Sequence, residues 1–409
     1  MPARVVLGVG AGISAYKACE LLRLLTEAGH RVKVVPTKDA LRFVGEATWA
    51  GLSGEPVLTD VWTGIAEAPH VKLGQEADLI VVAPATADLM ARAAAGMAGD
   101  LLTATLLMAS CPVVFAPAMH TEMWLHPATQ ANVATLRAHG AVVIEPAVGR
   151  LAGKDSGPGR LPDPAEIFAV ITSILSKPET GNDLSGRRVL VSAGGTREEI
   201  DPVRFIGNWS SGAQGYALAR TAVARGAEVT VVAANVALPD PAGAKVIKVT
   251  SAGEMLTAVT EAAATADAVV MAAAVADYRP AIRKAAKIKK DGQQQPEPIL
   301  LTENPDILAT LGRYRQDKLD QNHQKQVLVG FAAETDTSAQ AAKAKLARKG
   351  CDLLVVNPVG GGLGFGTADN EAVVYGTDGS VTEIPRGPKE VLADVVWDLV
   401  VARLRSTQP

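Results

Sequence analysis

The chain has 409 residues, 48% of them hydrophobic, with 40 Lys and Arg against 43 Asp and Glu and a formal net charge of −3. At about 100 to 200 residues per domain, this length predicts two or three domains, and the near-neutral charge argues against a nucleic-acid-binding protein. No apolar run reaches the roughly 20 residues of a transmembrane helix. Because three cysteines make no disulfide framework and no signal-peptide pattern follows the first residue, we expect a cytoplasmic protein without membrane or nucleic-acid partners.

Short β-branched runs alternate with helical patterns in the first half, as in βαβ units around a mostly parallel sheet. Strands are predicted at 5–9, 31–35, 79–83, 113–116 and 141–144, and a last helix at about 164–175. After the first strand, apolar residues recur at helical spacing up to Gly29. The members of this apolar series are Ala15, Ala18, Leu21, Leu22 and Leu25. The pattern predicts one doubly wound α/β domain.

Residues 176–186 form a polar stretch with Pro and Gly and without helical or strand period, which is typical of a linker. We therefore predict domains at 1–178 and 187–409, joined by a linker at 179–186. The alternation restarts with a strand at 188–193, a helix near 215–225 and a strand at 228–233. Residues 77–88 resemble 266–277, because each segment is a buried strand that opens into small residues and an Asp. Such a strand end lets a ligand approach the backbone, although two Ala-rich strands can also be alike by chance.

The turn after the first strand reads Gly8-Val9-Gly10-Ala11-Gly12-Ile13-Ser14 and would direct the amides of a helix N-terminus at a phosphate. It does not fit the G-x-G-x-x-G fingerprint of dinucleotide sites. Thr37 stands after the second strand, where such sites have an acidic residue for the ribose. The sequence therefore favours a mononucleotide such as FMN over NAD, which leaves an NAD-linked dehydrogenase as the less favoured alternative.

A loop after a predicted buried strand, residues 117–124, reads Pro-Ala-Met-His-Thr-Glu-Met-Trp. It resembles the P-x-M-N-x-x-M-W substrate motif of the flavin-dependent phosphopantothenoylcysteine decarboxylases. His70, expected on a loop, falls where that family has its essential histidine, and residues 149–164 resemble its substrate flap. The resemblance covers the first half and implies a flavodoxin-like flavoprotein domain of the HFCD type. In that family FMN oxidises the substrate's cysteinyl thiol, which allows the carboxylate to leave.

The resemblance also implies roles for individual residues. His70 would act in the oxidative step as base or substrate orienter, with His120 in place of the family's motif asparagine. The residues expected to line FMN are Gly12, Ser14, Thr37, Thr86, Ala87, Asp88 and Ala118, and those of the substrate and flap are Met119, Lys154 and Arg160. The family's flap pattern A-C-G-D reads Ala-Gly-Lys-Asp at 152–155, so Gly153 replaces the cysteine that protonates the enethiol. On the resemblance Lys154 would serve as the substitute acid, and a flavin-binding assembly or regulatory module without turnover is the alternative.

Two loops with glycine or serine, residues 192–198 and 205–212, predict a cradle for a triphosphate, although they do not form a Walker A motif. From the residues alone, a structural turn is an equal alternative. A basic cluster follows Asp277. It could bind a polyphosphate, and the alternative is an ordinary solvent-exposed charged surface. Its members are Arg279, Arg283, Lys284, Lys287, Lys289 and Lys290. Lys345 and Lys349 share a face of a predicted helix without an acidic partner, so we expect an anion between them.

Seven ordered motifs between residues 194 and 335, among them Gly194-Gly195-Thr196-Arg197 and Lys287-Ile288-Lys289-Lys290, resemble phosphopantothenate–cysteine ligase. The order of the two halves is that of bacterial bifunctional coenzyme A biosynthesis proteins. The resemblance implies that the carboxylate of phosphopantothenate attacks CTP to give an acyl-cytidylate and pyrophosphate, and that the amine of cysteine then displaces CMP. Lys287 and Mg²⁺, the latter held mainly through the CTP phosphates, would offset the phosphate charge.

On this resemblance the ligase half is a second Rossmann-like domain, in which Asn208, Arg204 and Lys287 act in catalysis. Phosphopantothenate would lie near Asn208, Ala273 and Ala274. The residues expected at CTP are Gly194, Gly195, Thr196, Ser210, Ser211, Gly212, Met271, Ala272, Ala273, Asp277, Lys287, Thr302, Glu303, Asn304, Pro305, Phe331, Lys345 and Lys349. Glu303 departs from the family, which often has lysine there. The family's trimers and dimers imply a homo-oligomer, a dodecamer.

Overall fold

The computed structural model describes residues 2–62, 68–150, 156–176, 182–289, 298–319, 326–334, 338–358 and 369–406. The chain divides into two compact units, which are described separately below. Unit 1 comprises Met1–Gly186, Ala222–Glu228 and Pro241–Ala244, and unit 2 comprises Arg187–Thr221, Val229–Asp240 and Lys245–Pro409. The predicted α/β class is confirmed in both.

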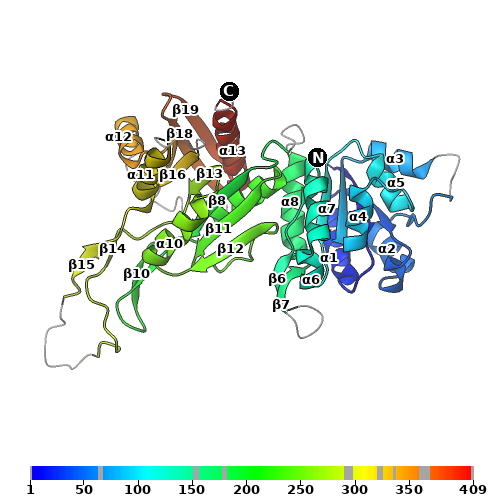
Figure 1. The fold of residues 1–409 in the computed structure, drawn as a ribbon, viewed down its shortest axis with the longest axis horizontal. Coiled ribbons are helices and arrows are strands. Elements are labelled where there is room, and N and C mark those ends of the chain that lie inside the picture. Colours follow the sequence, from blue (N-terminus) through cyan, green and yellow to red (C-terminus); the bar gives the residue numbers. More distant parts are fainter. Residues whose placement is uncertain are drawn as a thin grey trace. The chain divides into compact units, whose positions relative to one another are not determined.

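Unit 1 contains a five-stranded parallel sheet in the order β2-β1-β3-β4-β5 (Figure 1). The strands are β1 (Arg4–Val9), β2 (Arg31–Pro36), β3 (Leu79–Ala85), β4 (Val113–Pro117) and β5 (Val142–Val143). This is the flavodoxin-like order, in which ligands bind at the carboxyl ends of the strands. Every residue of β3 is buried, as expected for a central parallel strand covered on both faces.

The helices of unit 1 are α1 (Ala15–Glu27), α2 (Glu46–Ser53), α3 (Pro69–Glu76), α4 (Ala87–Ala94), α5 (Leu101–Leu107), α6 (Thr121–Leu125), α7 (Pro127–Ala138) and α8 (Pro164–Ser176), with a 3₁₀ turn at Ala40–Arg42. Two further strands, β6 (Ala147–Arg150) and β7 (Ser156–Arg160), pair antiparallel. Helix α1 buries the five apolar residues that the sequence spacing predicts. Burial of each leucine in that row contributes about 1.5–3 kcal/mol.

Unit 2 is built on an eight-stranded sheet in the order β12-β11-β8-β13-β16-β17-β18-β19. The strands are β8 (Arg188–Gly194), β11 (Glu228–Ala234), β12 (Ala244–Val249), β13 (Ala268–Met271), β16 (Val327–Glu334), β17 (Leu353–Pro358), β18 (Asp369–Gly376) and β19 (Val381–Pro388). Strands β8, β13, β16 and β17 are parallel, whereas β18 and β19 add an antiparallel edge. The sequence pattern predicted the parallel centre but not this edge.

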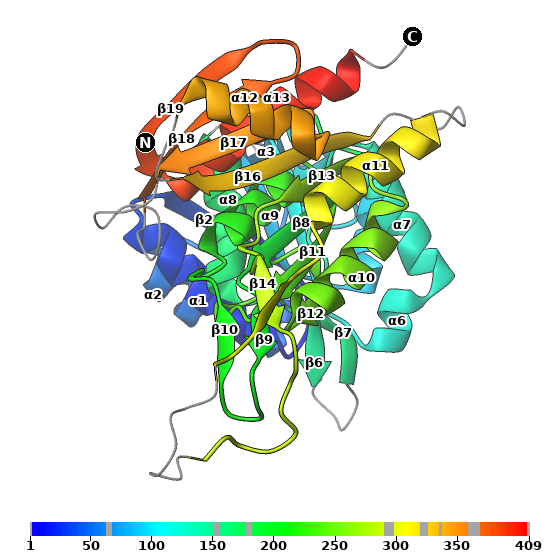
Figure 2. The same cartoon turned by 90° about the vertical axis from the view of Figure 1, so that its left-hand side faces the viewer.

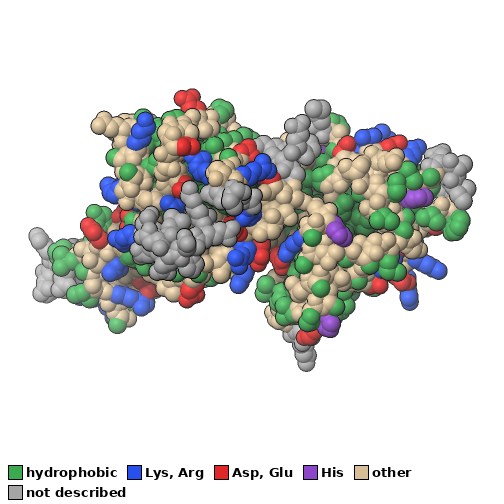
Figure 3. Space-filling view, turned by 45° about the horizontal axis from the view of Figure 1, so that its top comes forward, with side chains coloured by type: hydrophobic (Ala, Val, Ile, Leu, Met, Phe, Trp, Pro, Cys, Tyr) green, Lys and Arg blue, Asp and Glu red, His purple; other side chains and the backbone are tan. Residues whose placement is uncertain are grey.

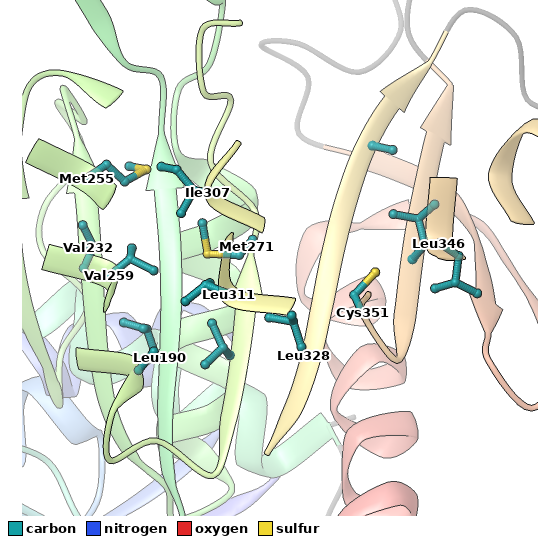
Figure 4. Packing of buried hydrophobic residues seen from close by; sticks show 14 of the residues in the cluster. Leu190, Val232, Met255, Val259, Met271, Ile307, Leu311, Leu328, Leu346 and Cys351 are labelled. Atoms are coloured by element: carbon teal, nitrogen blue, oxygen red, sulfur yellow. The ribbon is translucent and has the colours of Figure 1, made fainter. Parts of the chain in front are cut away.

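The helices of unit 2 are α9 (Ala213–Ala224), α10 (Ala252–Ala263), α11 (Ile307–Leu319), α12 (Ala339–Lys349) and α13 (Lys389–Arg405). Helices α10, α11 and α12 contribute Val259, Leu311 and Leu346 to a buried cluster that also contains Met271 and Leu328 from the strands (Figure 4). Because successive strand residues point to opposite faces, the buried strand residues outside this cluster face the other side of the sheet. There Trp397 of α13 donates its indole N–H to Leu218 O of α9 at 2.9 Å. Helices α9 and α13 therefore form a second wall.

Four short strands, β9 (Arg197–Glu199), β10 (Phe205–Gly207), β14 (Tyr278–Pro280) and β15 (Leu301–Glu303), pair as β9 with β10 and β14 with β15. Figures 1 and 2 show that they extend away from the eight-stranded sheet. Among the residues that the structure describes, no helix has the length and hydropathy to cross a membrane. Figure 3 shows Lys and Arg mixed with Asp and Glu on the face drawn, in keeping with the small net charge.

Candidate active sites

The carboxyl ends of four strands in unit 1 carry the loops predicted to line a flavin. Gly12 and Ser14 follow β1, Thr37 follows β2, residues 86–88 follow β3, and Ala118 follows β4. Because parallel strands end at the same edge of a sheet, these loops share one edge. The structure therefore brings the predicted FMN residues together, including Thr86, Ala87 and Asp88.

The first of these loops comes close to the loop after β3. Gly10 donates its N–H to Pro84 O at 3.0 Å, and a Cβ atom at Gly10 would lie 2.5 Å from the same oxygen. A Cβ at Gly12 would meet only Ser14 Oγ, at 3.9 Å, and the Ser14 side chain makes no capping hydrogen bond to α1. An open loop at a helix N-terminus without a side-chain cap suits a phosphate, so these residues fit the phosphate of a flavin mononucleotide.

Other polar residues at this edge form hydrogen bonds and an ion pair within the protein. The Thr86 hydroxyl accepts the Leu89 N–H at 3.2 Å and caps α4, and the Asp88 carboxylate pairs with Arg92 at 3.0 Å. The Thr37 N–H donates to Val9 O at 2.9 Å. These contacts fix the shape of the edge before any ligand binds.

His70 lies in α3, not on the loop that the sequence predicted. Pro69 occupies the first helical position and starts the helix one residue earlier. Because α3 runs back toward the start of β3, its N-terminus lies at the carboxyl edge of the sheet. The Nδ1 atom of His70 is buried and has no hydrogen-bond partner among the described residues. A buried nitrogen without a hydrogen-bond partner costs about 1–3 kcal/mol of folding free energy. A ligand that hydrogen-bonds to Nδ1 would remove this cost.

The β6–β7 hairpin is joined closely to the loop that resembles the decarboxylase substrate motif. Met119 donates its N–H to Gly159 O at 2.9 Å, and a Cβ at Gly159 would overlap Met119 O. His120 is exposed at the start of α6, and Arg160 is exposed at the end of β7. Gly153 and Lys154 lie outside the described residues. The hairpin thus positions Met119 and Arg160 from adjoining segments.

None of the three cysteines has the properties of an acid poised near neutral pH. Burial raises the pKa of Cys111 to about 11 and that of Cys351 to about 11, and burial also raises the pKa of Cys19. Cys351 lies in the core of unit 2. All three thiols are therefore protonated at neutral pH.

A cavity of about 720 Å³ in unit 2 lies at the carboxyl ends of β13, β16 and β17. It is the size of a ligand site and holds most of the residues that the sequence predicts for CTP and phosphopantothenate. The predicted residues that line it are Asn208, Ser210, Ser211, Gly212, Met271, Ala272, Ala273, Ala274, Asp277, Glu303, Asn304, Pro305, Phe331, Lys345 and Lys349.

Gly194, Gly195 and Thr196 do not line the cavity but support its wall. The buried Thr196 donates its N–H to Ala274 O at 3.2 Å and accepts the Ala276 N–H at Oγ1 at 2.9 Å. A Cβ at Gly195 would lie 2.6 Å from Asn208 O. The glycines therefore allow two loops to approach at the cavity, and Thr196 holds the strand end in place.

The expectation that Lys345 and Lys349 lack acidic partners is wrong. Lys345 Nζ lies 2.6 Å from Glu334 Oε1, and Lys349 forms an ion pair with Asp306. Glu334 ends β16 and Asp306 precedes α11, so spacing within one helix does not reveal either partner. Burial alone would raise the pKa of Asp306, but the hydrogen bonds from Lys349 and the Ala309 N–H lower it. Both lysines still line the cavity.

Arg204, Lys287 and Thr302 also do not line the cavity in this structure. The Arg204 guanidinium binds Asp201 Oδ2 with its Nη2 at 2.6 Å and donates to Ile288 O at 2.7 Å. The Asp201 side chain is fully buried. Although burial alone would raise it, hydrogen bonds from the N–H groups of Val203 and Ile288 and from Arg204 hold the Asp201 pKa well below its usual range. Lys287 is exposed beside this anchored segment.

The basic cluster is only partly available for a ligand. Arg279 donates to Glu303 O at 2.8 Å and to Asn304 Oδ1 at 3.0 Å, and Arg283 forms an ion pair with Glu199. Lys289 is exposed, whereas Lys290 lies outside the described residues. Arg279 thus joins β14 to the end of β15, and Arg283 joins the segment after β14 to β9.

Sequence reasoning missed four polar residues of the cavity, which lie on α9, β17, β18 and α13. Gln214, Asn357, Asn370 and Lys389 line the same cavity. They come from distant parts of the chain that belonged to none of the quoted motifs, so only the fold reveals that they meet. Within the described ranges, His, Cys, Asp and Glu form no group of three or more that could hold a metal ion.

Comparison with known proteins identifies both halves of the chain. Residues 2–176 match the Flavoprotein family model, and residues 184–404 match the DNA/pantothenate metabolism flavoprotein C-terminal domain. The coenzyme A biosynthesis bifunctional protein CoaBC of Mycobacterium bovis is 57% identical over 410 residues, covering 99% of this chain and 97% of the relative. The protein of the same name from Mycolicibacterium smegmatis is 55% identical over 409 residues, covering 98% of each.

Solved structures also resemble the chain. The C-terminal domain of a coenzyme A biosynthesis bifunctional protein CoaBC is 37% identical, with a TM-score of 0.46, and covers 55% of this chain and 100% of that chain. Because the relatives from Mycobacterium bovis and Mycolicibacterium smegmatis align with nearly the full sequence and both halves match their family models, the chain belongs to the family of the coenzyme A biosynthesis bifunctional proteins CoaBC.

Proposed function

We propose that the chain ligates 4′-phosphopantothenate to L-cysteine with CTP and then decarboxylates the product to 4′-phosphopantetheine. The observation that carries the ligase half is the 720 Å³ cavity, which gathers loops more than 100 residues apart in sequence. The decarboxylase half rests on the flavin-suited edge of the first sheet and on His70.

In the ligase reaction, the carboxylate of phosphopantothenate attacks the α-phosphorus of CTP and releases pyrophosphate. The resulting acyl-cytidylate then reacts with the amine of cysteine, and CMP leaves. The N-terminus of α9 and the Ser210–Gly212 loop offer backbone N–H groups to the phosphates. Asn208, whose Nδ2 donates to Val275 O at 3.0 Å, would hold the acyl intermediate at the cavity wall.

Lysine side chains on α12 would balance the phosphate charge. Lys345 and Lys349 line the cavity on α12 while being held by Glu334 and Asp306, which fixes the ammonium groups before CTP arrives. Mg²⁺ would arrive bound to the CTP phosphates. Asp277 lines the same cavity. Lys287, on the exposed segment anchored through Asp201, would reach the phosphates from outside.

For the decarboxylase reaction, FMN would take up two electrons from the substrate's thiol group, which makes loss of the carboxylate easy, and would return them to the enethiol that remains. The loops containing Gly12, Ser14 and Thr86 would hold it at the carboxyl edge of the sheet. His70 would take up a proton or orient the substrate, and its buried Nδ1 is placed for such a contact. Met119 and Arg160, joined through the β6–β7 hairpin, would position the substrate.

A second candidate for the first half is a flavin-binding module without complete turnover. It is favoured by Gly153 at the position of the family's flap cysteine and by the high pKa of Cys111, which makes that thiol a poor replacement acid. A single experiment separates the candidates. Full turnover of phosphopantothenoylcysteine releases CO₂ and yields phosphopantetheine, whereas the module alone binds flavin and yields no phosphopantetheine.

The two halves can be tested with matched variants of the whole protein. Asn208→Ala should abolish CTP- and cysteine-dependent pyrophosphate release and leave CO₂ release from phosphopantothenoylcysteine intact, while Asn132→Ala in α7 leaves both unchanged. His70→Asn should abolish CO₂ release from phosphopantothenoylcysteine and leave pyrophosphate release intact. His139→Asn, at an exposed position, serves as its control. Loss of both activities in either variant, with the fold intact, would contradict the assignment of separate sites.

We also propose that the protein is a dodecamer of trimers and dimers, as the resemblance implies. Sedimentation velocity of the full chain measures this directly. A monomer at micromolar concentration would refute it.

A further inference from the structure

The turn after β11 contains a residue with an unusual backbone conformation. Asn235 directly follows β11 and has a φ of 52°, in the left-handed region that residues other than glycine rarely adopt. Asparagine tolerates this conformation better than most residues, but the conformation persists only where the surrounding structure holds it. Asn235 does not line the ligase cavity. Residues of this kind gather where function requires a particular backbone geometry.

Residues 234–236, called the Asn235 turn below, contact two glycine-containing loops of the ligase half. Gly195 donates its N–H to Ala234 O at 3.1 Å. A Cβ atom at Gly212 would lie 2.5 Å from Val236 Cγ2, and Gly212 lines the cavity. The Asn235 turn therefore fits closely against both loops.

The side-chain amide of Asn235 joins the first of these loops to the residue after β12. Its Nδ2 donates to Gly195 O at 2.9 Å and to Thr250 O at 3.0 Å. Because a backbone oxygen can only accept, these two bonds use both hydrogens of the amide nitrogen and fix the orientation of the amide. Thr250 O also accepts the Arg197 N–H at 2.9 Å. Since the N–H and the C=O of Gly195 are both bound to the Asn235 turn, the position of Gly195 is set from this side.

Gly195 in turn determines where residues of the cavity lie. A Cβ atom at Gly195 would lie 2.6 Å from Asn208 O, so the two backbones are in close contact. Gly195 also forms an isolated parallel β-bridge with Ala274. Asn208 and Ala274 both line the cavity. A displacement of Gly195 would therefore move residues that face the ligand.

We propose that Asn235 is a positioning residue of the ligase site, which holds Gly195 through its side-chain amide and so places Asn208. This inference rests on the proposed ligase function. The positive φ belongs to the arrangement, because it turns the chain so that Ala234 O and the Asn235 amide meet the same glycine. Asn208 would hold the acyl intermediate, which forms only after CTP has bound. Loss of this positioning therefore lowers kcat more than it raises the KM for CTP.

A purely structural role is the alternative, and Gln326 provides a matched control for it. The Nε2 of Gln326 also bridges two backbone oxygens, Ala263 O and Ala266 O, each at 2.7 Å. Gln326 immediately precedes β16, so it lies at the amino ends of the parallel strands, whereas the cavity lies at their carboxyl ends. Loss of either amide removes two hydrogen bonds to the backbone, but only Asn235 is connected to Asn208.

The test uses the full-length protein with Asn235→Gly, which allows the positive φ and removes both hydrogen bonds. Asn235→Asp is a second variant, because it keeps the shape and tolerates the left-handed conformation but turns a carboxylate oxygen toward the two carbonyl oxygens. Gln326→Ala is the control. Steady-state kinetics with phosphopantothenate, CTP and cysteine gives kcat and the KM for CTP of each variant, and thermal unfolding measures its stability.

We expect Asn235→Gly and Asn235→Asp to lower kcat for pyrophosphate release by about tenfold or more, with the KM for CTP changed by less than about threefold. Gln326→Ala should also lower the unfolding temperature but leave kcat unchanged. A wild-type kcat in folded Asn235→Gly overturns the proposal, and so does an equal loss of kcat in Gln326→Ala. If Asn235→Gly is unfolded, the same criterion applies to Asn235→Asp. Failure of the wild-type protein to release pyrophosphate from CTP would instead refute the ligase function.

Discussion

The backbone oxygen of Asn208 faces Gly195 so closely that a Cβ atom at residue 195 would lie 2.6 Å from it. The two residues belong to different loops, and Asn208 also donates from Nδ2 to Val275 O at 3.0 Å. A residue expected to act on the acyl intermediate is therefore positioned by a glycine that does not itself line the cavity. The role of Gly195 is to allow the two loops to approach.

This contact predicts the effect of Gly195→Ala. The added methyl group must displace Asn208, and a shift of about 1 Å at a reacting centre can cost roughly a hundredfold in rate. Pyrophosphate release should fall by about that factor, while CO₂ release from phosphopantothenoylcysteine stays at the wild-type rate. Gly253→Ala in α10 is the control, because its Cβ meets nothing closer than 3.9 Å. Equal activity of the two glycine variants would contradict the account of Gly195.

The Lys345–Glu334 pair predicts a compensating double variant. Lys345→Met should raise the KM for CTP by about tenfold or more, because it removes an ammonium group from the cavity and leaves the Glu334 carboxylate to repel phosphates. Adding Glu334→Gln should recover part of the loss. Steady-state kinetics over a range of CTP concentrations makes the comparison. No recovery in the double variant would show that Glu334 is not the source of the repulsion.

Asp201 predicts a pH-dependent effect on stability. Its folded pKa lies below that of the unfolded chain, so its contribution is present above the unfolded value of about 3.9 and is lost as the pH falls through the folded value. Asp201→Asn should therefore lower the urea midpoint of the ligase half at pH 7, and the difference from wild type should shrink as the pH falls below about 4. A difference that stays constant down to pH 3 would contradict the charge-based explanation.

The cysteines predict slow reaction with thiol reagents. Because burial raises the pKa of Cys111 and Cys351 to about 11, little thiolate is present at pH 7, and alkylation by iodoacetamide should be far slower in the native protein than in urea. Mass spectrometry of timed samples measures this rate. Replacing Cys19 and Cys111 by serine should also leave the yield of phosphopantetheine unchanged, because neither thiol is a suitable acid. CO₂ release without phosphopantetheine in that variant would identify one of them as the missing proton donor.

Local patterns predicted much of the fold because they depend on neighbouring residues. The apolar spacing in α1 identified the five side chains that are buried, and the β-branched runs located β1, β3 and β4 to within a few residues. The predicted strand at 141–144 is only Val142–Val143, because the strand ends depend on pairing with β4, which the apolar run does not define. The topological rule for parallel sheets then placed the flavin loops at one edge.

Features that join distant segments could not be predicted in the same way. The partners of Lys345 and Lys349 come from β16 and from the residue before α11, outside the helix whose spacing was considered. Lys389 begins α13 and reaches the cavity only because α13 packs on α9. The antiparallel edge of β18 and β19 is likewise defined by its pairing with β17.

The most direct measurement of the central claim is a coupled assay with the full-length protein, phosphopantothenate, CTP, Mg²⁺ and cysteine, in which pyrophosphate and CO₂ are followed together. We predict that pyrophosphate release requires both CTP and cysteine for sustained turnover, and that CO₂ follows it after a lag in nearly equal final amount, with phosphopantetheine as the product. Pyrophosphate release without CO₂ would contradict the decarboxylase half, and the absence of both would contradict the proposed function as a whole.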